Sequence, residues 1–230
     1  MHLILVPGFW LGAESWADVA FRLTAAGIDH RALTLPGLER SATIGASIRL
    51  VDHIAAVGAA IDEVGDEVVL VGHSGAGPIC HAAAAEHTDR VRRVVHVDTW
   101  PLGPGLAVNA EMAANLAVIP LPDWSAFETE DLVDMNDSLR QRLVDEARPQ
   151  PAAVARDSFP MMNESRFGIP TTIICCEFSS AQIRAWISSG EERLAELGRL
   201  RDVSFVEIPT GHWPQFSRPH ELAAALVSLA

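Results

Sequence analysis

The chain has 230 residues, 49% of them apolar and 20% charged, which suits one folded domain with a modest insertion and argues against disorder. Its formal net charge is −13, and every basic side chain is arginine. Because such a negative field repels phosphate groups, we expect neither a nucleic-acid partner nor binding to an anionic membrane.

Short apolar runs alternate with helical patterns from the N-terminus onward. Residues 2–6 predict a strand, and a helix is predicted over about 13–26, where Gly27 ends it. A second strand is predicted over 28–35. Apolar residues at helical spacing then predict a helix over 48–64.

The middle of the chain holds its most continuous apolar strand. Residues 67–72 read EVVLVG and, after Glu67, form a continuous apolar run, as in a strand buried on both faces of a parallel sheet. An alanine-rich helix to His87 and a strand over 91–98 follow. This alternation predicts an α/β fold, with a mainly parallel sheet covered by helices on both faces.

The rhythm changes over residues 101–168, which are rich in proline, methionine, aromatic and acidic residues. We interpret this segment as a helical cap inserted between a first core part (1–100) and a second core part (169–230). It is a surface connection with its own helices, a lid whose methionine and aromatic side chains line an apolar pocket, or both, since the two interpretations are compatible. The remaining predicted elements are a strand over 169–178, a helix to about Leu200, a strand over 203–208 and a helix from about Pro219.

A serine stands where the buried strand meets the alanine-rich helix. The sequence around Ser74 reads VGHSGAG, a G-x-S-x-G type of motif with Ala76 in the last small position. Small neighbours are needed because the nucleophile sits on a tight turn, and the helix N-terminus favours developing negative charge. The alternatives are a structural turn with an incidental serine and a phosphate-binding turn, although the glycine spacing differs from the dinucleotide fingerprint and the P-loop lysine is missing.

A serine hydroxyl needs a base, which this strand order would deliver after the last strand. His212 lies there, directly after Gly211, whereas the other histidines fall on predicted strands, helices or the surface. We interpret His73, beside the serine, as a packing residue. The sequence therefore predicts Ser74 as nucleophile and His212 as general base.

Two further expectations concern the surroundings of Ser74. Backbone N–H groups of Gly75 and Phe9 would form an oxyanion hole, with Trp10 as a substitute for Phe9. Aromatic side chains would line the substrate pocket and favour a ring-bearing substrate, although such residues are also typical of a core. The tryptophans expected in the pocket are Trp10, Trp100, Trp124 and Trp213.

Together these motifs resemble the α/β-hydrolase superfamily, and more narrowly the plant methyl-salicylate esterase and hydroxynitrile lyase group with its small bacterial esterase relatives. The resemblance implies acyl chemistry without a cofactor on small, often aromatic esters. No H-E-x-x-H motif is present and the adjacent Cys175 and Cys176 would point to opposite faces of a strand, so we expect no metal. The stretches that carry the resemblance are LILVPGFWLGAESW, LVGHSGAG, TTIICCEF followed by IRAWI, and GHWPQFSRPHEL.

The acidic residue that would complete a catalytic triad with Ser74 and His212 does not stand at the position that the resembling group uses. The resemblance places an aspartate just after the strand at 171–177, where this chain has CCEFSS. Asp98, at the end of the preceding strand, and Glu177 are the replacements, and we favour Asp98 because strand alternation would turn Glu177 away. A loop-capping role for Asp98, and a Ser-His dyad without an acid, remain open.

We therefore predict a carboxylesterase that cleaves a small neutral or aromatic ester through an acyl-enzyme, with carbamates and amides as further bond types. One rival is a lyase with the same Ser-His pair, although lyases of the resembling group use a lysine that this chain lacks. The other is a non-catalytic ligand-binding homologue. The expected partner is a small-molecule substrate, and a homodimer is left open. The odd number of cysteines and the absence of a signal-peptide pattern or an 18-residue apolar span predict a cytoplasmic location.

Overall fold

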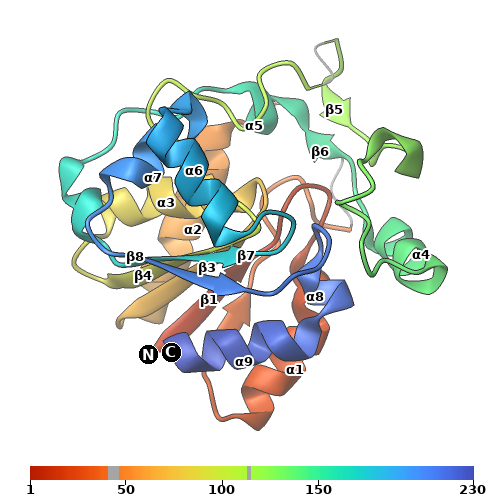
Figure 1. Ribbon diagram of the computed structural model, residues 1–230, viewed down its shortest axis with the longest axis horizontal. Coiled ribbons are helices and arrows are strands. Elements are labelled where there is room, and N and C mark those ends of the chain that lie inside the picture. Colours follow the sequence, from red (N-terminus) through yellow and green to blue (C-terminus); the bar gives the residue numbers. More distant parts are fainter. Residues whose placement is uncertain (41–46, 113–114) are drawn as a thin grey trace.

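A parallel sheet forms the centre of the molecule. The computed structural model describes residues 1–40, 47–112 and 115–230, and in this part the large sheet has the strand order β2-β1-β3-β4-β7-β8 (Figure 1). Every pairing within it is parallel, which confirms the predicted sheet. The strands are β1 (His2–Val6), β2 (His30–Ala32), β3 (Val68–His73), β4 (Val91–Val97), β7 (Thr171–Cys175) and β8 (Val203–Glu207).

Side chains of successive strand residues enter different cores. In β1, Ile4 packs into the core on one face of the sheet and Leu5 into the core on the other. In β3, Leu70 and Val71 alternate in the same way, and the whole strand is buried. The continuous apolar run in the sequence thus reflects a strand covered on both faces.

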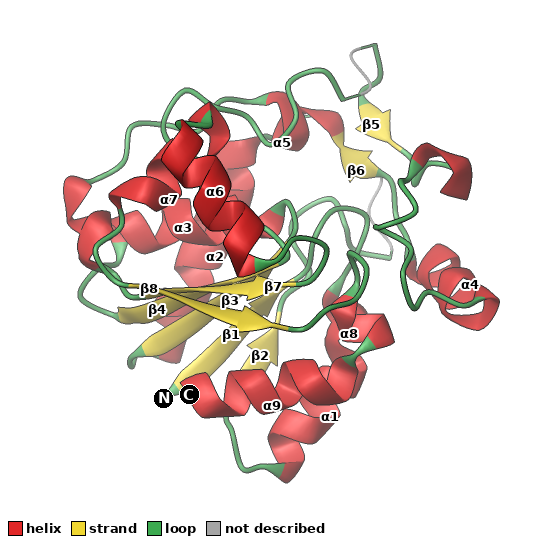
Figure 2. Cartoon of the chain, viewed as in Figure 1, coloured by secondary structure: helices red, strands yellow, loops and turns green. Residues whose placement is uncertain are grey.

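Helices cover both faces, as Figure 2 shows. One face carries α2 (Leu50–Val64), α3 (Ala76–Glu86), α6 (Ser180–Ser189) and α7 (Ala195–Arg199), and the other carries α1 (Ala17–Ala25) and α9 (Pro219–Leu229). The short α8 (Pro214–Ser217) precedes α9. No helix in the described residues is both long and apolar enough to cross a bilayer.

Three predicted elements differ in extent. The predicted helix over 13–26 divides into a 3-10 turn, Ala13–Trp16, and α1. The predicted helix reaching Leu200 divides into α6 and α7, because Gly190 adopts a φ of 79° and ends α6. The predicted strand over 28–35 is shorter, since β2 is an edge strand of which only three residues pair with β1.

The segment between β4 and β7 contains little regular structure. Its elements are β5 (Val118–Ile119), α4 (Asp137–Glu146), β6 (Gln150–Pro151) and α5 (Ala152–Arg156), and β5 pairs with β6 in an antiparallel manner. Asp157 ties this segment to the core by accepting two hydrogen bonds from the Arg49 guanidinium, at 2.6 and 2.8 Å. The predicted cap over 101–168 includes residues 113–114, which lie outside the described residues. The division into core and cap segments stays a prediction.

Candidate active site

Ser74 lies on a sharp corner directly after β3. Its φ of 51° is in the left-handed region, which is strained for a residue with a side chain. The corner is tight: a Cβ atom at Gly72 would lie 2.7 Å from both the Ala76 carbonyl oxygen and the Gly77 Cα atom. The small residues of the motif therefore allow β3 and α3 to meet, and the corner presents the Ser74 hydroxyl at the carboxyl end of the sheet.

His212 lies in the loop after β8 and faces Ser74. The distance between His212 Nε2 and Ser74 Oγ is 2.7 Å. The backbone of the cap holds this loop, because the N–H of His212 donates to the Asp131 carbonyl oxygen at 2.9 Å and the N–H of Gly211 donates to the Val133 carbonyl oxygen at 3.1 Å. Gly211 has no room for a side chain, since a Cβ atom there would clash with the Asp131 carbonyl.

Asp98 contacts the other side of the imidazole. Its Oδ2 lies 2.7 Å from His212 Nδ1, and its Oδ1 accepts hydrogen bonds from the N–H groups of Cys176 and Glu177 at 3.2 and 3.0 Å. Burial raises the pKa of Asp98, but the hydrogen bond from His212, the charge of His212 and the backbone hydrogen bond from Glu177 together outweigh it and hold the pKa below the usual value. An ionised Asp98 can only accept hydrogen bonds, so the Nδ1 atom of His212 carries the proton. The Nε2 atom of His212 is then free to accept the hydroxyl proton of Ser74.

Glu177 also reaches the imidazole. Its Oε1 lies 3.0 Å from His212 Nδ1, and its side chain is only 7% exposed. The expectation that strand alternation turns Glu177 away is wrong, because β7 ends at Cys175 and Glu177 belongs to the following loop. Burial raises the pKa of Glu177 to about 7. The structure thus brings both candidate acids, Asp98 and Glu177, to the same nitrogen.

His73 supports the loop of His212 from behind. Its Nε2 donates to the His212 carbonyl oxygen at 2.6 Å, and its Nδ1 accepts from the Gln215 side-chain amide at 3.2 Å. Burial lowers the pKa of His73 to about 3, so this ring is neutral. Its place agrees with the interpretation of His73 as a packing residue.

The electrostatic surroundings of His212 favour its charged form. Burial lowers the pKa of His212, but hydrogen bonds to Asp98 and Glu177 and the charges of both carboxylates outweigh it and raise the pKa to about 10. A histidine that takes a proton from a serine must carry that charge transiently. The arrangement therefore stabilises the imidazolium that proton removal from Ser74 would form.

Phe9 and Gly75, the residues expected to supply the oxyanion donors, line one hollow together with Ser74. The Phe9 ring packs so closely on Gly75 that a Cβ atom there would lie 2.6 Å from the ring. The N–H of Trp10 donates to the Gln150 side-chain oxygen at 3.4 Å, which occupies the proposed substitute donor. The N–H groups of Phe9 and Gly75 remain the predicted pair.

Two hollows adjoin the catalytic candidates, and Ser74, Gly75 and His212 line both. Val108 also lines both. The larger has a volume of about 240 Å³ and is also lined by Phe9, Trp10, Asn109, Met112, Phe127 and Asp131. The smaller has a volume of about 130 Å³ and is also lined by Pro78, Asp98, Thr99, Trp100, Leu102 and Arg193.

Two of the four expected pocket tryptophans lie elsewhere. Trp10 and Trp100 line the hollows, but Trp213 is only 2% exposed and packs in a separate core with Leu11. Trp124 stacks edge-on against Trp213, with ring centroids 6.0 Å apart, and lines a different surface hollow. The expectation for Trp124 and Trp213 is therefore wrong, because ring packing between the cap and the histidine loop buries Trp213 and holds Trp124 against it.

Sequence reasoning missed several residues that line the hollows. Asp131 and Asn109 add polar side chains to the larger hollow, and Arg193 borders the smaller one. Arg193 donates to the carbonyl oxygens of Ala107 and Val108 at 3.3 and 2.9 Å, and so anchors the backbone of Val108, which lines both hollows. These residues belong to no motif, and in the sequence Asp131 is one of several acidic residues in the cap.

A histidine and two carboxylates are also a set that can bind a divalent cation. Ligand atoms of Asp98, Glu177 and His212 lie within 4.8 Å of one another. However, Nδ1 donates its proton to Asp98 and has no lone pair for a metal in this arrangement. The three groups are better described as a hydrogen-bonded cluster, and the expectation of no metal stays a prediction.

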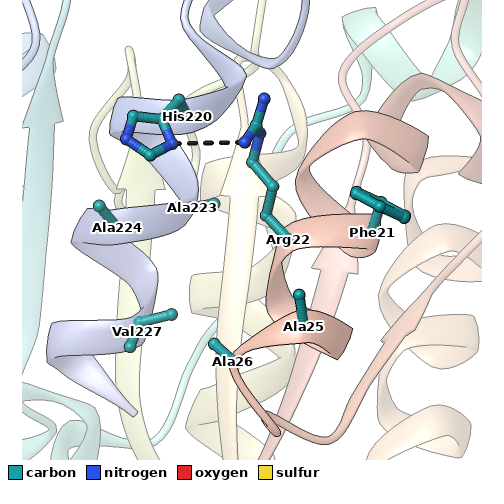
Figure 3. A pocket seen from close by; sticks show the side chains of 8 residues that line it. All are labelled: Phe21, Arg22, Ala25, Ala26, His220, Ala223, Ala224 and Val227. Carbon is teal, nitrogen blue, oxygen red and sulfur yellow. Dashed lines mark hydrogen bonds between the residues drawn. The ribbon is translucent and has the colours of Figure 1, made fainter.

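A larger hollow lies far from Ser74, in the groove between α1 and α9 (Figure 3). Its volume is about 460 Å³, and small side chains such as Ala25 and Ala223 line most of it. Its polar side chains are Arg22, which donates to His220 Nδ1 at 3.4 Å, and His220 itself. Because no nucleophile lines this groove, we place the candidate active site at Ser74.

Comparison with known proteins agrees with this geometry. Residues 3–225 match the alpha/beta hydrolase family. One curated relative, a carbendazim hydrolyzing esterase from a Nocardioides species, is 33% identical over 103 residues, which are 43% of this chain and 42% of the relative. The match thus spans less than half the length of that relative.

Solved structures match over nearly the whole chain. An extracellular alpha/beta-hydrolase from a Paenibacillus species, described as a structural and functional homologue of tobacco salicylic acid binding protein 2, has a TM-score of 0.79 at 18% identity and covers 99% of this chain and 98% of its own. A methylesterase from Arabidopsis has a TM-score of 0.78 at 18% identity and covers 100% and 98%. At this identity the likeness shows the fold.

Proposed function

This chain belongs to the alpha/beta hydrolase family, as the resemblance predicted, and we propose that it is a serine hydrolase that cleaves a carboxylic ester through an acyl-enzyme. One observation carries the proposal: Ser74 Oγ, the His212 ring and Asp98 Oδ2 form a continuous chain of hydrogen bonds, each 2.7 Å long. In this hydrogen-bonded array a half-buried imidazole contacts a hydroxyl on a strained corner. That arrangement activates a serine for attack on a carbonyl carbon.

In the proposed mechanism, Ser74 Oγ attacks the ester carbonyl carbon while His212 Nε2 takes the hydroxyl proton. The N–H groups of Phe9 and Gly75 hold the negative oxygen of the tetrahedral intermediate. His212 gives the proton to the departing alcohol, which leaves Ser74 acylated. Water then attacks the acyl carbon and gives a proton to His212, and the acid departs as Ser74 regains its proton.

The hollows beside Ser74 support a small ester with one ring-bearing part. We propose that the hollow of about 240 Å³, lined by Phe9, Trp10 and Phe127, takes the ring. The hollow of about 130 Å³ takes a small group on the other side of the carbonyl. The esterase and the methylesterase among the similar proteins support an ester as the substrate, and a carbamate is the second bond type to test.

A fluorophosphonate that phosphorylates activated serines tests the proposal. We expect stoichiometric labelling, which Ser74→Ala abolishes. Ser228→Ala is the matched control, because Ser228 is an exposed helix residue that donates only to a backbone carbonyl and its loss should leave the labelling unchanged. A panel of aryl and alkyl esters and carbamates would then rank the bond types. The proposal would be contradicted if the fluorophosphonate does not label the protein and the protein cleaves none of these esters and carbamates.

A further inference from the structure

A positive side chain borders the smaller of the two hollows beside Ser74. Arg193 lies in a short 3-10 helix, Glu192–Leu194, between α6 and α7, and lines this hollow together with Ser74 and His212. Among the residues that the structure describes, no other arginine lines either hollow, and the sequence contains no lysine. An arginine stays charged over the whole working pH range, so this hollow has a permanent positive charge beside the proposed nucleophile.

The backbone of a neighbouring loop holds the Arg193 guanidinium in place. Its Nη1 donates to the Ala107 carbonyl oxygen at 3.3 Å, and its Nη2 donates to the Val108 carbonyl oxygen at 2.9 Å. A guanidinium has more N–H donors than these two hydrogen bonds use. The side chain is therefore fixed at the edge of the hollow while donors remain for a ligand.

No carboxylate within the described part of the chain forms an ion pair with Arg193. Glu196, three residues further along, is engaged elsewhere, because its Oε1 lies 2.6 Å from Arg166 Nε. Asp98 lines the same hollow, but its Oδ2 lies 2.7 Å from His212 Nδ1. The positive charge of Arg193 is therefore available to an anion that enters the hollow.

On the premise of the proposed function, we propose that Arg193 binds a carboxylate on the acyl part of the ester, so that the substrates are half-esters of short dicarboxylic acids with ring-bearing alcohols. The planar guanidinium matches the two oxygens of a carboxylate in geometry. A carboxylate held there would keep the acyl group in place while water attacks the acyl-enzyme. Arg193 is a specificity-determining residue in this scheme, because it contacts the substrate away from the reacting atoms.

Size and charge both support this class of substrate. The hollow of about 130 Å³ has the volume of about four water molecules, which suits two methylene groups and a carboxylate. The net charge of −13 disfavours anions over most of the protein, so an anionic substrate needs a local positive charge in order to bind. The expectation of a neutral ester would then hold for the ring-bearing part alone.

Two esters of similar shape separate the binding of a carboxylate from a purely structural role of Arg193. Monobenzyl succinate carries the carboxylate, and benzyl levulinate has a neutral methyl ketone in its place. We expect kcat/KM to be about fivefold higher for the succinate, mainly through a lower KM, which is the size of effect that an exposed charge pair gives. Arg193→Gln should remove this preference, and Arg193→Lys, which keeps the charge, should retain part of it.

A matched control removes the same charge elsewhere. Arg201 is exposed and lines neither hollow, so Arg201→Gln should show the same preference for the succinate as the parent protein. A parent protein without the preference would overturn the proposal, as would an Arg193→Gln variant that keeps it. The same holds if Arg193→Gln lowers kcat/KM equally for both esters, because Arg193 would then only anchor the loop of Val108.

A binding measurement does not depend on turnover. Isothermal titration calorimetry of the Ser74→Ala protein, with and without Arg193→Gln, would compare the Kd values of the two esters. Monobenzyl succinate should bind about fivefold more tightly than benzyl levulinate only when Arg193 is present. If this difference occurs in a protein that cleaves neither ester and that the fluorophosphonate does not label, the carboxylate site stands and the proposed function fails. If esters are cleaved but the two bind equally well, the proposed function stands and the carboxylate site fails.

Discussion

The sheet and the cap contribute to the candidate site in different ways. Ser74 and Asp98 follow adjacent parallel strands, and both adopt a φ of 51°, so the sheet positions each of them through its own backbone. Asp131 reaches the site from the cap, where it lies in an irregular segment and is held by contacts with the loop of His212. The difference teaches that the sheet positions the proposed nucleophile and acid, while the segment between β4 and β7 holds the loop of the proposed base and lines the larger hollow.

Removing the nucleophile tests the contribution of the sheet most strongly. Ser74→Ala should lower kcat by about 10⁶ toward the best ester, as loss of a triad serine does. Steady-state kinetics would measure this, with Ser228→Ala again as the control. If kcat falls only a few-fold, the reaction does not pass through Ser74.

Asp98 and Glu177 can be compared by isosteric amides. Asp98→Asn should lower kcat by about 10⁴, because Nδ1 then loses the acceptor that fixes its tautomer. Glu177→Gln should lower kcat far less, since Asp98 still holds the ring. Steady-state kinetics at the pH optimum of each variant would show which substitution lowers kcat more. The reverse order would make Glu177 the triad acid and Asp98 a capping residue.

The packing of the cap against the loop of His212 can be disrupted by a substitution at Gly211. In Gly211→Ala the added Cβ atom would clash with the Asp131 carbonyl, so the loop must shift and the distance from His212 to Ser74 must change. We expect a destabilisation of about 1–3 kcal/mol and a clear loss of kcat.

The matched control for that change is Gly168→Ala, where a Cβ atom has no heavy atom within 4 Å. The Tm measured by thermal unfolding and the kcat of this control should be close to those of the parent protein. A Gly211→Ala variant with unchanged kcat would show that the cap does not position the base.

The smallest expected effect concerns Val108, which lines both hollows. Val108→Ala should enlarge the space beside Ser74 and lower KM several-fold for esters with a bulkier group, with little change in kcat for the smallest esters. Val144→Ala is the control, since Val144 is exposed on α4 and lines neither hollow. An unchanged preference for ester size would show that Val108 does not limit the space.

The predictable parts of the fold and site depend on local patterns. The alternation of strands and helices predicts the sheet, and the small residues around Ser74 predict its corner because close packing of β3 on α3 requires them. The loop after the last strand likewise predicts the place of His212. Each of these inferences uses a few neighbouring residues and the rules of parallel sheets.

The unpredicted parts depend on distant contacts. Glu177 faces His212 because its strand ends two residues earlier, and strand periodicity cannot show where a strand ends. Trp213 is buried by packing against Phe127 of the cap, with ring centroids 5.3 Å apart. Asp131 and Arg193 line the hollows only because the tertiary structure brings them there. The cytoplasmic location stays a prediction.

The most direct test of the central claim is to trap the acyl-enzyme. The protein would be mixed with p-nitrophenyl acetate and quenched in acid within the first turnover, and its peptides would then be mapped by mass spectrometry. The account predicts an acetyl group on Ser74 and none in Ser74→Ala. Rapid ester cleavage with no acetylated peptide, or with the acetyl group on another side chain, would contradict it.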